Sequence, residues 1–129
     1  MKCPCESGLE YSECCQDYHA KRRNAPTAEA LMRARYAAYV RKEITFLVET
    51  THPTQRDVDL ANGYSHTANS IQWIGLEILQ TLNGAESDNM GKVEFRASYI
   101  QDGQRAIHHE KSRFKRYAGK WYYLDGYVS

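Results

Sequence analysis

The sequence predicts an α+β protein in which several helices precede a curved antiparallel sheet. Residues 28–42 are rich in alanine and long side chains and lack glycine and proline, which favours a helix. After Ser70 the chain is rich in β-branched and aromatic residues, which favours strands. Asp102-Gly103, flanked by strand-like segments, is a strong hairpin signal. Helices followed by strands indicate about three helices packed on one face of a four-stranded sheet.

Local signals place the helices. Thr27 suits a helix N-cap, and Glu29 puts a carboxylate in the first turn, where the helix dipole favours it. His52-Pro53 ends the second helical segment, because the residue before proline resists helical dihedral angles. Gly63 interrupts a weaker third segment. The expected helices are residues 28–42, 43–51 and 56–69.

The turns predict a strand register. If Asp102-Gly103 and Ala118-Gly119 are two-residue turns, side chains on the last three strands alternate in step between two faces. The expected strands are residues 71–82, 92–101, 105–117 and 120–128. The face that we expect the helices to cover carries Val93, Phe95, Ala97, Tyr99, Ala106, His108, Glu110, Ser112, Phe114, Trp121, Tyr123, Asp125 and Tyr127.

Four polar side chains lie on this otherwise apolar face, namely His108, Glu110, Ser112 and Asp125. A polar group removed from water needs a hydrogen-bond partner or a wet cavity. One interpretation is a pocket between sheet and helices, in which Glu110 or Asp125 acts as a general base and His108 as an acid or orienter. No catalytic residue is assigned, because no nucleophile stands beside a base.

The alternative interpretation is a polar core without chemistry. Ser112 would then bond Asp125 across the strands, and Glu110 would pair with Arg35, which stands among alanines and tyrosines of the first helix. Arg35 at the helix edge, with its guanidinium in water, fits the sequence equally well. The candidate pocket residues are Arg35, Tyr39, His108, Glu110, Ser112 and Asp125, with His52 and His66 as further candidates.

All four cysteines lie in the first fifteen residues, at Cys3, Cys5, Cys14 and Cys15. Sulfurs so close in sequence converge on one point with little loop-closure entropy. Zn²⁺ takes four thiolates tetrahedrally, and a filled ligand shell makes it structural rather than catalytic. Disulfides and free surface thiols are the alternatives, and disulfides need an oxidising compartment. His19 is a spare candidate ligand.

Charge and composition narrow the function classes. Seventeen basic and sixteen acidic residues give a formal charge of +1, and a zinc ion on four thiolates brings it to about −1. This balance argues against nucleic-acid binding driven by bulk charge. No apolar run approaches the ~20 residues that span a bilayer, and residues 1–4 do not resemble the start of a signal peptide. We expect a cytoplasmic protein without a membrane or specific nucleic-acid partner.

The cysteine segment resembles a known module. The SEC-C motif, the zinc-binding tail module of the preprotein translocase ATPase SecA, is similar to Cys3-Pro4-Cys5, Ser7-Gly8, Tyr11 and Cys14-Cys15. Glu6 departs from that motif, which usually has glycine there. The ATPase module engages the export chaperone SecB and the ribosome. The resemblance therefore implies a protein partner or the ribosome for this lobe.

A second resemblance covers nearly the whole chain. The bacterial YchJ family is similar to this chain at Leu31-Met32-Arg33-Ala34-Arg35-Tyr36, Thr51-His52-Pro53, Glu110-Lys111-Ser112-Arg113-Phe114 and Gly119-Lys120-Trp121-Tyr122-Tyr123-Leu124-Asp125-Gly126. This resemblance implies an N-terminal zinc module followed by a cone-shaped domain like nuclear transport factor 2. The expected organisation is a zinc-binding lobe at residues 1–19, a linker at 20–26 and an α+β domain at 27–129.

Three functions fit these features. In the preferred one, the zinc lobe and the basic linker Lys21-Arg22-Arg23 dock a protein partner, by analogy one in protein biogenesis or export. In the alternative, the interior of the cone binds a small molecule or hosts a hydrolase, isomerase or dehydratase. A third is a dimer through the outer sheet face, where charges such as Lys111 and Lys115 disfavour a dry interface.

Overall fold

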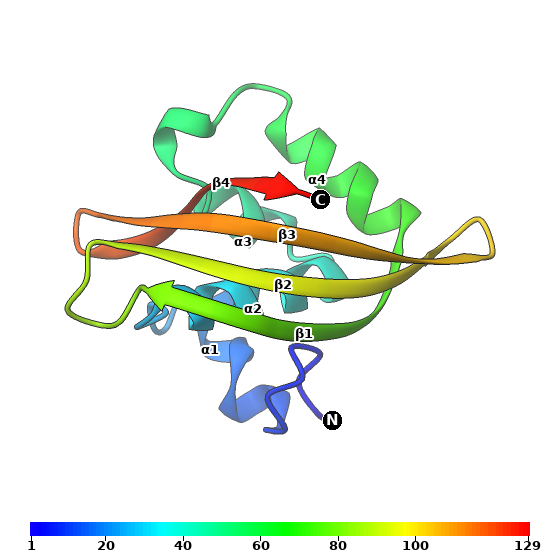
Figure 1. Ribbon diagram of the computed structural model, residues 1–129, viewed down its shortest axis with the longest axis horizontal. Coiled ribbons are helices and arrows are strands. Elements are labelled where there is room, and N and C mark those ends of the chain that lie inside the picture. Colours follow the sequence, from blue (N-terminus) through cyan, green and yellow to red (C-terminus); the bar gives the residue numbers. More distant parts are fainter.

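A computed structural model describes residues 1–129 and shows one antiparallel sheet with helices packed against one face (Figure 1). The strands, in spatial order, are β1 (Gln72–Asn83), β2 (Met90–Gln101), β3 (Gln104–Tyr117) and β4 (Lys120–Val128). The helices are α1 (Cys15–His19), α2 (Ala28–Arg41), α3 (Ile44–Glu49) and α4 (Leu60–Ser70), with 3₁₀ turns at Tyr11–Glu13 and Pro53–Gln55. The predicted α+β class, with a curved four-stranded sheet, is confirmed.

Helix α2 is the element on which the other parts pack. Thr27 caps it as predicted, because its Oγ1 accepts a hydrogen bond from the Ala30 amide at 3.0 Å. Lys42 ends it in the left-handed conformation. Ala34 and Ala37 are fully buried, so their small side chains permit close approach on more than one side of the helix. The helix is therefore covered by the sheet, by α3 and by the N-terminal lobe.

The other helices differ from the expectation mainly at their ends. Helix α3 lies inside the predicted segment 43–51. Helix α4 begins at Leu60 rather than at residue 56, because the Asp57 carboxylate accepts the Asp59 amide at 2.8 Å and forms a turn before the helix. Gly63 does not interrupt it, since the Gly63 amide bonds the Asp59 carbonyl at 3.0 Å. None of the helices combines the length and the apolar character needed to cross a membrane.

The predicted hairpin registers are confirmed at both turns. Gln101 pairs with Gln104 and Tyr117 with Lys120. Asp102 and Gly103 have φ angles of 53° and 76°, and Ala118 and Gly119 have 52° and 82°. Positive φ at both central residues is the geometry of a type I′ turn, whose twist matches that of the flanking strands.

Further along β4 the register shifts, and this corrects one prediction. Tyr123 pairs with Phe114, but Asp125 pairs with Arg113, so Leu124 is an extra residue in a β-bulge. Side chains beyond a one-residue bulge change faces. Asp125 and Tyr127 therefore lie on the outer face with Arg113, and their expected placement on the covered face was wrong.

The buried core lies between α2, α3 and the inner face of the sheet. Its largest fully buried side chains are Phe114, Leu31, Leu47 and Val93. The end of α3 is tied to the outer strand β4, because the Tyr123 amide bonds the Thr50 carbonyl and the His52 amide bonds the Tyr123 carbonyl, both at 2.8 Å. These two hydrogen bonds hold the edge strand β4 against the end of α3. A space lies between α2, α4 and the central strands.

Candidate metal centre and interior cavity

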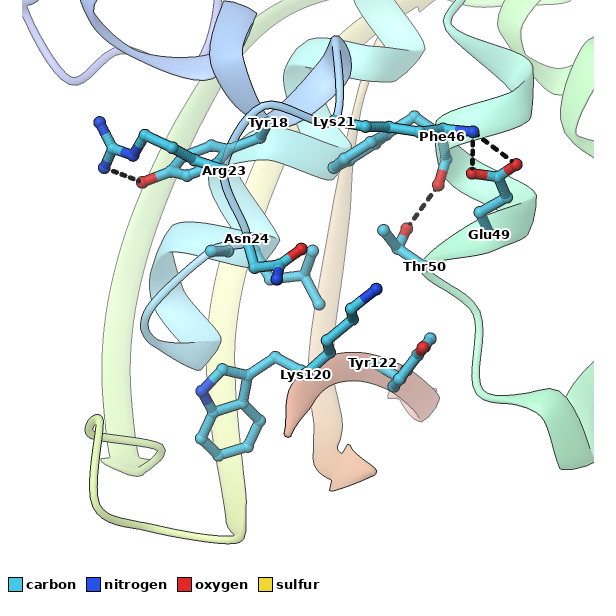
Figure 2. A pocket seen from close by; sticks show the side chains of 12 residues that line it. Tyr18, Lys21, Arg23, Asn24, Phe46, Glu49, Thr50, Lys120 and Tyr122 are labelled. Carbon is cyan, nitrogen blue, oxygen red and sulfur yellow. Dashed lines mark hydrogen bonds and ion pairs between the residues drawn. The ribbon is translucent and has the colours of Figure 1, made fainter. Parts of the chain in front are cut away.

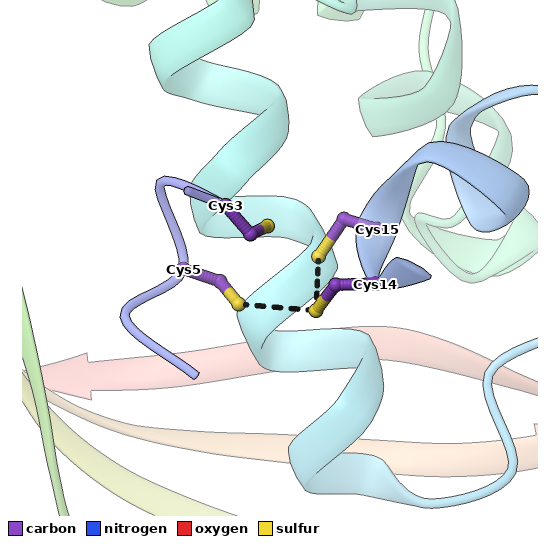
Figure 3. Close-up of side chains that lie close together, drawn as sticks. All are labelled: Cys3, Cys5, Cys14 and Cys15. Carbon is purple, nitrogen blue, oxygen red and sulfur yellow. Dashed lines mark hydrogen bonds between the residues drawn. The ribbon is translucent and has the colours of Figure 1, made fainter. Parts of the chain in front are cut away.

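The four cysteine sulfurs converge on one point (Figure 3). All four Sγ atoms lie within 4.8 Å of one another, with 3.6 Å between Cys5 and Cys14 and 3.8 Å between Cys14 and Cys15. Tetrahedral zinc with Zn–S bonds of about 2.3 Å places its sulfurs roughly 3.8 Å apart. A disulfide needs about 2.05 Å, and all four cysteines are free thiols. The cluster can therefore hold a metal ion, and its spacing fits tetrahedral coordination.

Local backbone structure brings the two cysteine pairs together. Cys3 and Cys5 lie in a tight loop that is closed by the Cys3 amide and the Leu9 carbonyl at 2.8 Å. Cys14 and Cys15 lie at the start of α1. Glu6, within the loop, has a φ of 65°, a left-handed conformation that glycine adopts more readily. This backbone geometry explains why glycine is usual at this position of the SEC-C motif.

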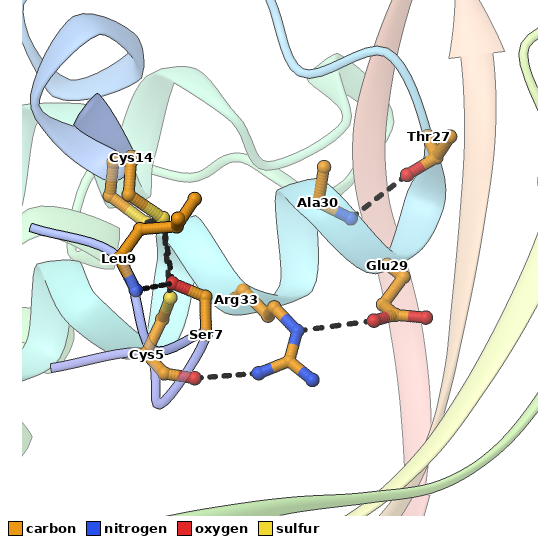
Figure 4. Close-up of polar contacts among 9 residues, drawn as sticks. Cys5, Ser7, Leu9, Cys14, Thr27, Glu29, Ala30 and Arg33 are labelled. Atoms are coloured by element: carbon orange, nitrogen blue, oxygen red, sulfur yellow. Dashed lines mark hydrogen bonds and ion pairs between the residues drawn. The ribbon is translucent and has the colours of Figure 1, made fainter. Parts of the chain in front are cut away.

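Polar contacts hold the cysteine loop against α2 (Figure 4). Ser7 Oγ accepts the Leu9 amide at 3.3 Å, which leaves its hydroxyl hydrogen free for Cys14 Sγ, 3.2 Å away. Arg33 of α2 donates from Nη1 to the Cys5 carbonyl at 2.7 Å and from Nε to Glu29 at 3.1 Å. Arg33 therefore joins the sulfur cluster to the central helix.

The lobe is packed on the rest of the protein rather than free on its linker. Cys3, Cys5 and Cys15 belong to the same buried cluster as α2. The Leu76 amide of β1 donates to the Glu6 carboxylate at 3.2 Å. His19 is not close to the sulfurs' common point, because its Nδ1 lies 2.7 Å from Tyr11 Oη and its Nε2 2.8 Å from the Ala34 carbonyl. Both ring nitrogens are used structurally.

The sulfurs differ in their affinity for protons. Hydrogen bonding from Cys15, against the opposing effect of burial, lowers the pKa of Cys5 to about 4. Burial raises the pKa of Cys3 to about 11, and donation to Cys5, with burial, raises the pKa of Cys15. Four crowded thiolates repel one another, so full ionisation requires a positive ion between them. A divalent cation would supply that charge.

A surface pocket of about 160 Å³ lies beside the lobe, between residues 18–25, α3 and β4 (Figure 2). Lys21 of the linker pairs with Glu49 at 2.8 Å, and Arg23 donates to the Tyr18 hydroxyl at 3.3 Å. Lys120 extends from β4 toward Thr50, between the linker and α3. The charged side chains that line the pocket are basic apart from Glu49, and its aromatic lining comprises Tyr18, Phe46, Trp121 and Tyr122.

A second cavity, of about 250 Å³, lies between α2, α4 and the inner sheet face. Five of the six predicted pocket residues line it, and Asp125 does not. Phe95, Ala97 and Tyr123 belong to the face that we expected the helices to cover. The lining residues that the sequence did not indicate are Met32, Tyr36 and Tyr64, which come from the helices, and Trp73 of β1, where a β-bulge at Ile74 interrupts the alternation. The lining comprises Met32, Arg35, Tyr36, Tyr39, Tyr64, Trp73, Phe95, Ala97, His108, Glu110, Ser112 and Tyr123.

Glu110 is the centre of a polar network in this cavity. Its Oε1 lies 2.8 Å from His108 Nε2, and its Oε2 accepts from Ser112 Oγ at 2.5 Å and from the Tyr123 hydroxyl at 3.1 Å. The expected pairs of Ser112 with Asp125 and of Glu110 with Arg35 are both wrong. The β-bulge places Asp125 on the outer face, where Arg113 Nε donates to it at 2.6 Å.

The two further histidine candidates do not line the cavity. His66 is exposed on α4. His52 is buried, but its ring lies against Tyr117 and Tyr122 at the opposite end of the sheet. His108 is therefore the histidine that the fold brings to Glu110.

The Glu110 network makes stability depend on pH. Burial by itself raises the pKa of the Glu110 carboxyl, but donation from His108, Ser112 and Tyr123 outweighs it and holds the pKa below the usual 4.5. A carboxyl with a lowered folded-state pKa contributes stability above its unfolded-state pKa and loses it as the pH falls through the folded-state value. We expect the free-energy advantage of the native protein over Glu110→Gln to shrink from pH 7 toward pH 3 in urea unfolding. Parallel pH profiles would contradict this.

Comparisons with known proteins agree with this architecture. A family model described as "YchJ, middle NTF2-like domain" matches residues 27–126, and the SEC-C motif matches residues 2–17. A UPF0225 protein of Geobacter sulfurreducens is 46% identical over 125 residues, which is 97% of this chain and 78% of the relative. The UPF0225 protein YchJ of Shigella dysenteriae is 38% identical over 128 residues, which is 96% of this chain and 81% of the relative.

Two solved structures share the whole fold. A SEC-C motif containing protein from Rhodopseudomonas palustris has a TM-score of 0.91 at 35% identity, over 100% of this chain and 99% of the other. A sec-c motif containing protein from Psychrobacter arcticus has a TM-score of 0.81 at 33% identity, over 98% and 82%. This chain therefore belongs to the YchJ (UPF0225) family, with a SEC-C motif ahead of an NTF2-like domain.

Proposed function

We propose that this protein is a cytoplasmic zinc-binding interaction module that docks an acidic protein partner. The observation that carries the proposal is the convergence of four cysteine sulfurs within 4.8 Å. Four protein ligands fill a tetrahedral zinc ion and leave no position for substrate, so the metal shapes a surface. Cys3, Cys5, Cys14 and Cys15 would hold the ion.

The surface beside the metal centre supports an acidic partner. The sulfur cluster fixes the start of α1, from which residues 20–26 lead past the pocket of Figure 2. Arg22 is held by Asp17 at 2.9 Å and Lys21 by Glu49, whereas Lys120 makes no ion pair. An exposed lysine in a pocket that is also lined by aromatic side chains suits a carboxylate of a protein partner.

The motif supports one class of partner. The match of residues 2–17 to the SEC-C motif, and its resemblance to the tail module of the translocase ATPase, support a partner in protein biogenesis or export. The lobe is anchored to α2 by Arg33, so a bound partner would meet the metal lobe and the pocket as one rigid surface.

Affinity capture with matched variants tests this proposal. Immobilised native protein is compared with Cys14→Ser, Lys120→Glu and Arg105→Glu, and captured proteins are identified and quantified by mass spectrometry. Arg105 is exposed at the other end of β3, beside the Asp102-Gly103 turn, so Arg105→Glu makes the same charge change away from the pocket. We expect one acidic protein to be lost at least about tenfold with Cys14→Ser and Lys120→Glu and retained with Arg105→Glu.

Two outcomes would reject the proposal. Equal capture by all four proteins would show that neither the metal lobe nor the pocket selects a partner. Capture of intact ribosomes through their RNA, lost on nuclease treatment, would replace a protein partner with a nucleic-acid one.

A further inference from the structure

The interior cavity contains a buried cation that has no acidic partner. Arg35 is only 4% exposed. Its Nη1 donates to the Leu47 carbonyl at 2.8 Å and to Thr50 Oγ1 at 2.7 Å, and its Nη2 to the Tyr64 hydroxyl at 3.0 Å. All three acceptors are neutral, and none of the ion pairs in the structure includes Arg35. Burying a charge without an opposite charge costs free energy.

The Glu110 carboxylate, which also lines the cavity, already has three hydrogen-bond donors. Glu110 accepts from His108, Ser112 and Tyr123. Tyr123 separates it from Arg35, because the guanidinium lies 4.6 Å from the centre of the Tyr123 ring while the hydroxyl of that ring bonds Glu110. At one end of the cavity the Glu110 carboxylate is surrounded by hydrogen-bond donors. At the other end the Arg35 guanidinium contacts only neutral groups.

A second donor in the cavity wall also lacks an acceptor. Trp73 Nε1 is buried and has no hydrogen-bond partner, although buried indole N–H groups usually find one. The other tryptophan satisfies this rule, since Trp121 Nε1 donates to the Pro26 carbonyl at 3.1 Å. Arg35 and Trp73 come from different elements, α2 and β1, and both line the same cavity.

We propose that this cavity binds a small carboxylate with a planar apolar body. The carboxylate would supply the negative charge missing beside Arg35 and an acceptor for the Trp73 indole. The body would lie among the aromatic side chains of Tyr36, Tyr39, Tyr64, Trp73, Phe95 and Tyr123. A cavity of about 250 Å³ limits the ligand to a single ring or a short chain. An amine would instead place a second cation beside Arg35.

Isosteric probes separate the possible ligand charges. Benzoate, benzamide and benzylamine share a ring and differ in charge. In ¹H–¹⁵N spectra of the full chain, benzoate should shift the indole signal of Trp73 saturably and leave that of Trp121 unchanged. The Trp73→Phe variant assigns the two signals. At about a 100-fold excess over Kd, benzoate should also raise Tm by roughly 5–10 °C, and benzamide should bind at least about tenfold more weakly.

Variants test the two donors. Trp73→Phe keeps an aromatic ring but removes the N–H, and should weaken benzoate binding by about tenfold, measured by the shift in Tm. Arg35→Lys should weaken it further, because an ammonium loses the planar two-donor contact. Arg96→Lys, on the outer face of β2, is the matched control and should bind normally.

Three results would overturn the proposal. Benzylamine binding at least as tightly as benzoate would show that the negative charge of Glu110, and not the positive charge of Arg35, selects the ligand. Failure of benzoate to produce a saturable shift up to about 20 mM would exclude useful affinity for the carboxylate. Equal shifts at Trp73 and Trp121 would indicate non-specific binding. None of these measurements involves the cysteine lobe. The ligand-binding proposal can therefore be rejected while the docking proposal stands.

Discussion

Removing the proposed zinc ion is expected to lower the thermal midpoint by about 10 °C or more and to disorder the first fifteen residues. Structural zinc supplies on the order of 10 kcal/mol in small modules, and a lobe of this size has little apolar core of its own. Cys3, Cys5 and Cys15 share the buried cluster of α2, so loss of the ion would also loosen the central helix. Thermal melts with and without a strong chelator, together with metal analysis giving one zinc per chain, measure the effect.

Two serine-related variants give this prediction a graded control. Cys15→Ser removes a fully buried member of the proposed ligand set and should reproduce the chelated state without chelator. Ser7→Ala keeps all four ligands and removes only the hydroxyl 3.2 Å from Cys14 Sγ, so it should cost about 1 kcal/mol and retain zinc. A metal-free protein with an unchanged midpoint and an ordered N-terminus would contradict a metal-dependent lobe.

Truncation of Phe114 should be the most damaging single change in the sheet. Phe114 is 0% exposed and meets the Tyr123 ring at a centroid distance of 5.8 Å. Its replacement by alanine leaves a cavity between a paired strand and packed helices, neither of which can easily collapse. We expect a loss of about 3–5 kcal/mol in the free energy of unfolding, measured in urea.

The same strand offers a matched comparison. Ile107 is 61% exposed on the outer face of β3, so Ile107→Ala should change the free energy of unfolding by no more than about 0.5 kcal/mol. Similar losses for Phe114→Ala and Ile107→Ala would mean that burial on the inner face does not govern the stability of the sheet. A fully folded Phe114→Ala protein with native stability would contradict the packing described above.

The sequence predicts part of the arrangement of the cysteine lobe and part of that of the polar cavity. The convergence of the sulfurs could be predicted because all four lie within fifteen residues, so local chain geometry almost forces them together. The anchoring of that lobe by Arg33 and Glu6 could not, because Glu6 bonds the amide of Leu76, far away in the sequence. Nothing in the local pattern marks either residue as a contact.

The cavity was predicted only in part. His108, Glu110 and Ser112 share a face because they alternate along β3 on one side of a hairpin whose turn is readable from Asp102-Gly103. Arg35 was identified as unusual by its apolar surroundings, but its neutral partners come from α3 and α4. A pairing between helices depends on their packing, which a single helical pattern does not specify.

The sequence by itself determined the elements whose signals are local. These are the capped helix α2, the glycine-containing type I′ turns and the cluster of four cysteines. Only the tertiary structure decided that Asp125 lies outside the cavity and which partners Arg35 has within it. The extra residue Leu124 in β4 turns Asp125 outward to Arg113, and pairing between strands sets that bulge. One residue of slip reverses the faces of a strand, so non-local pairing outweighed the alternation read along the chain.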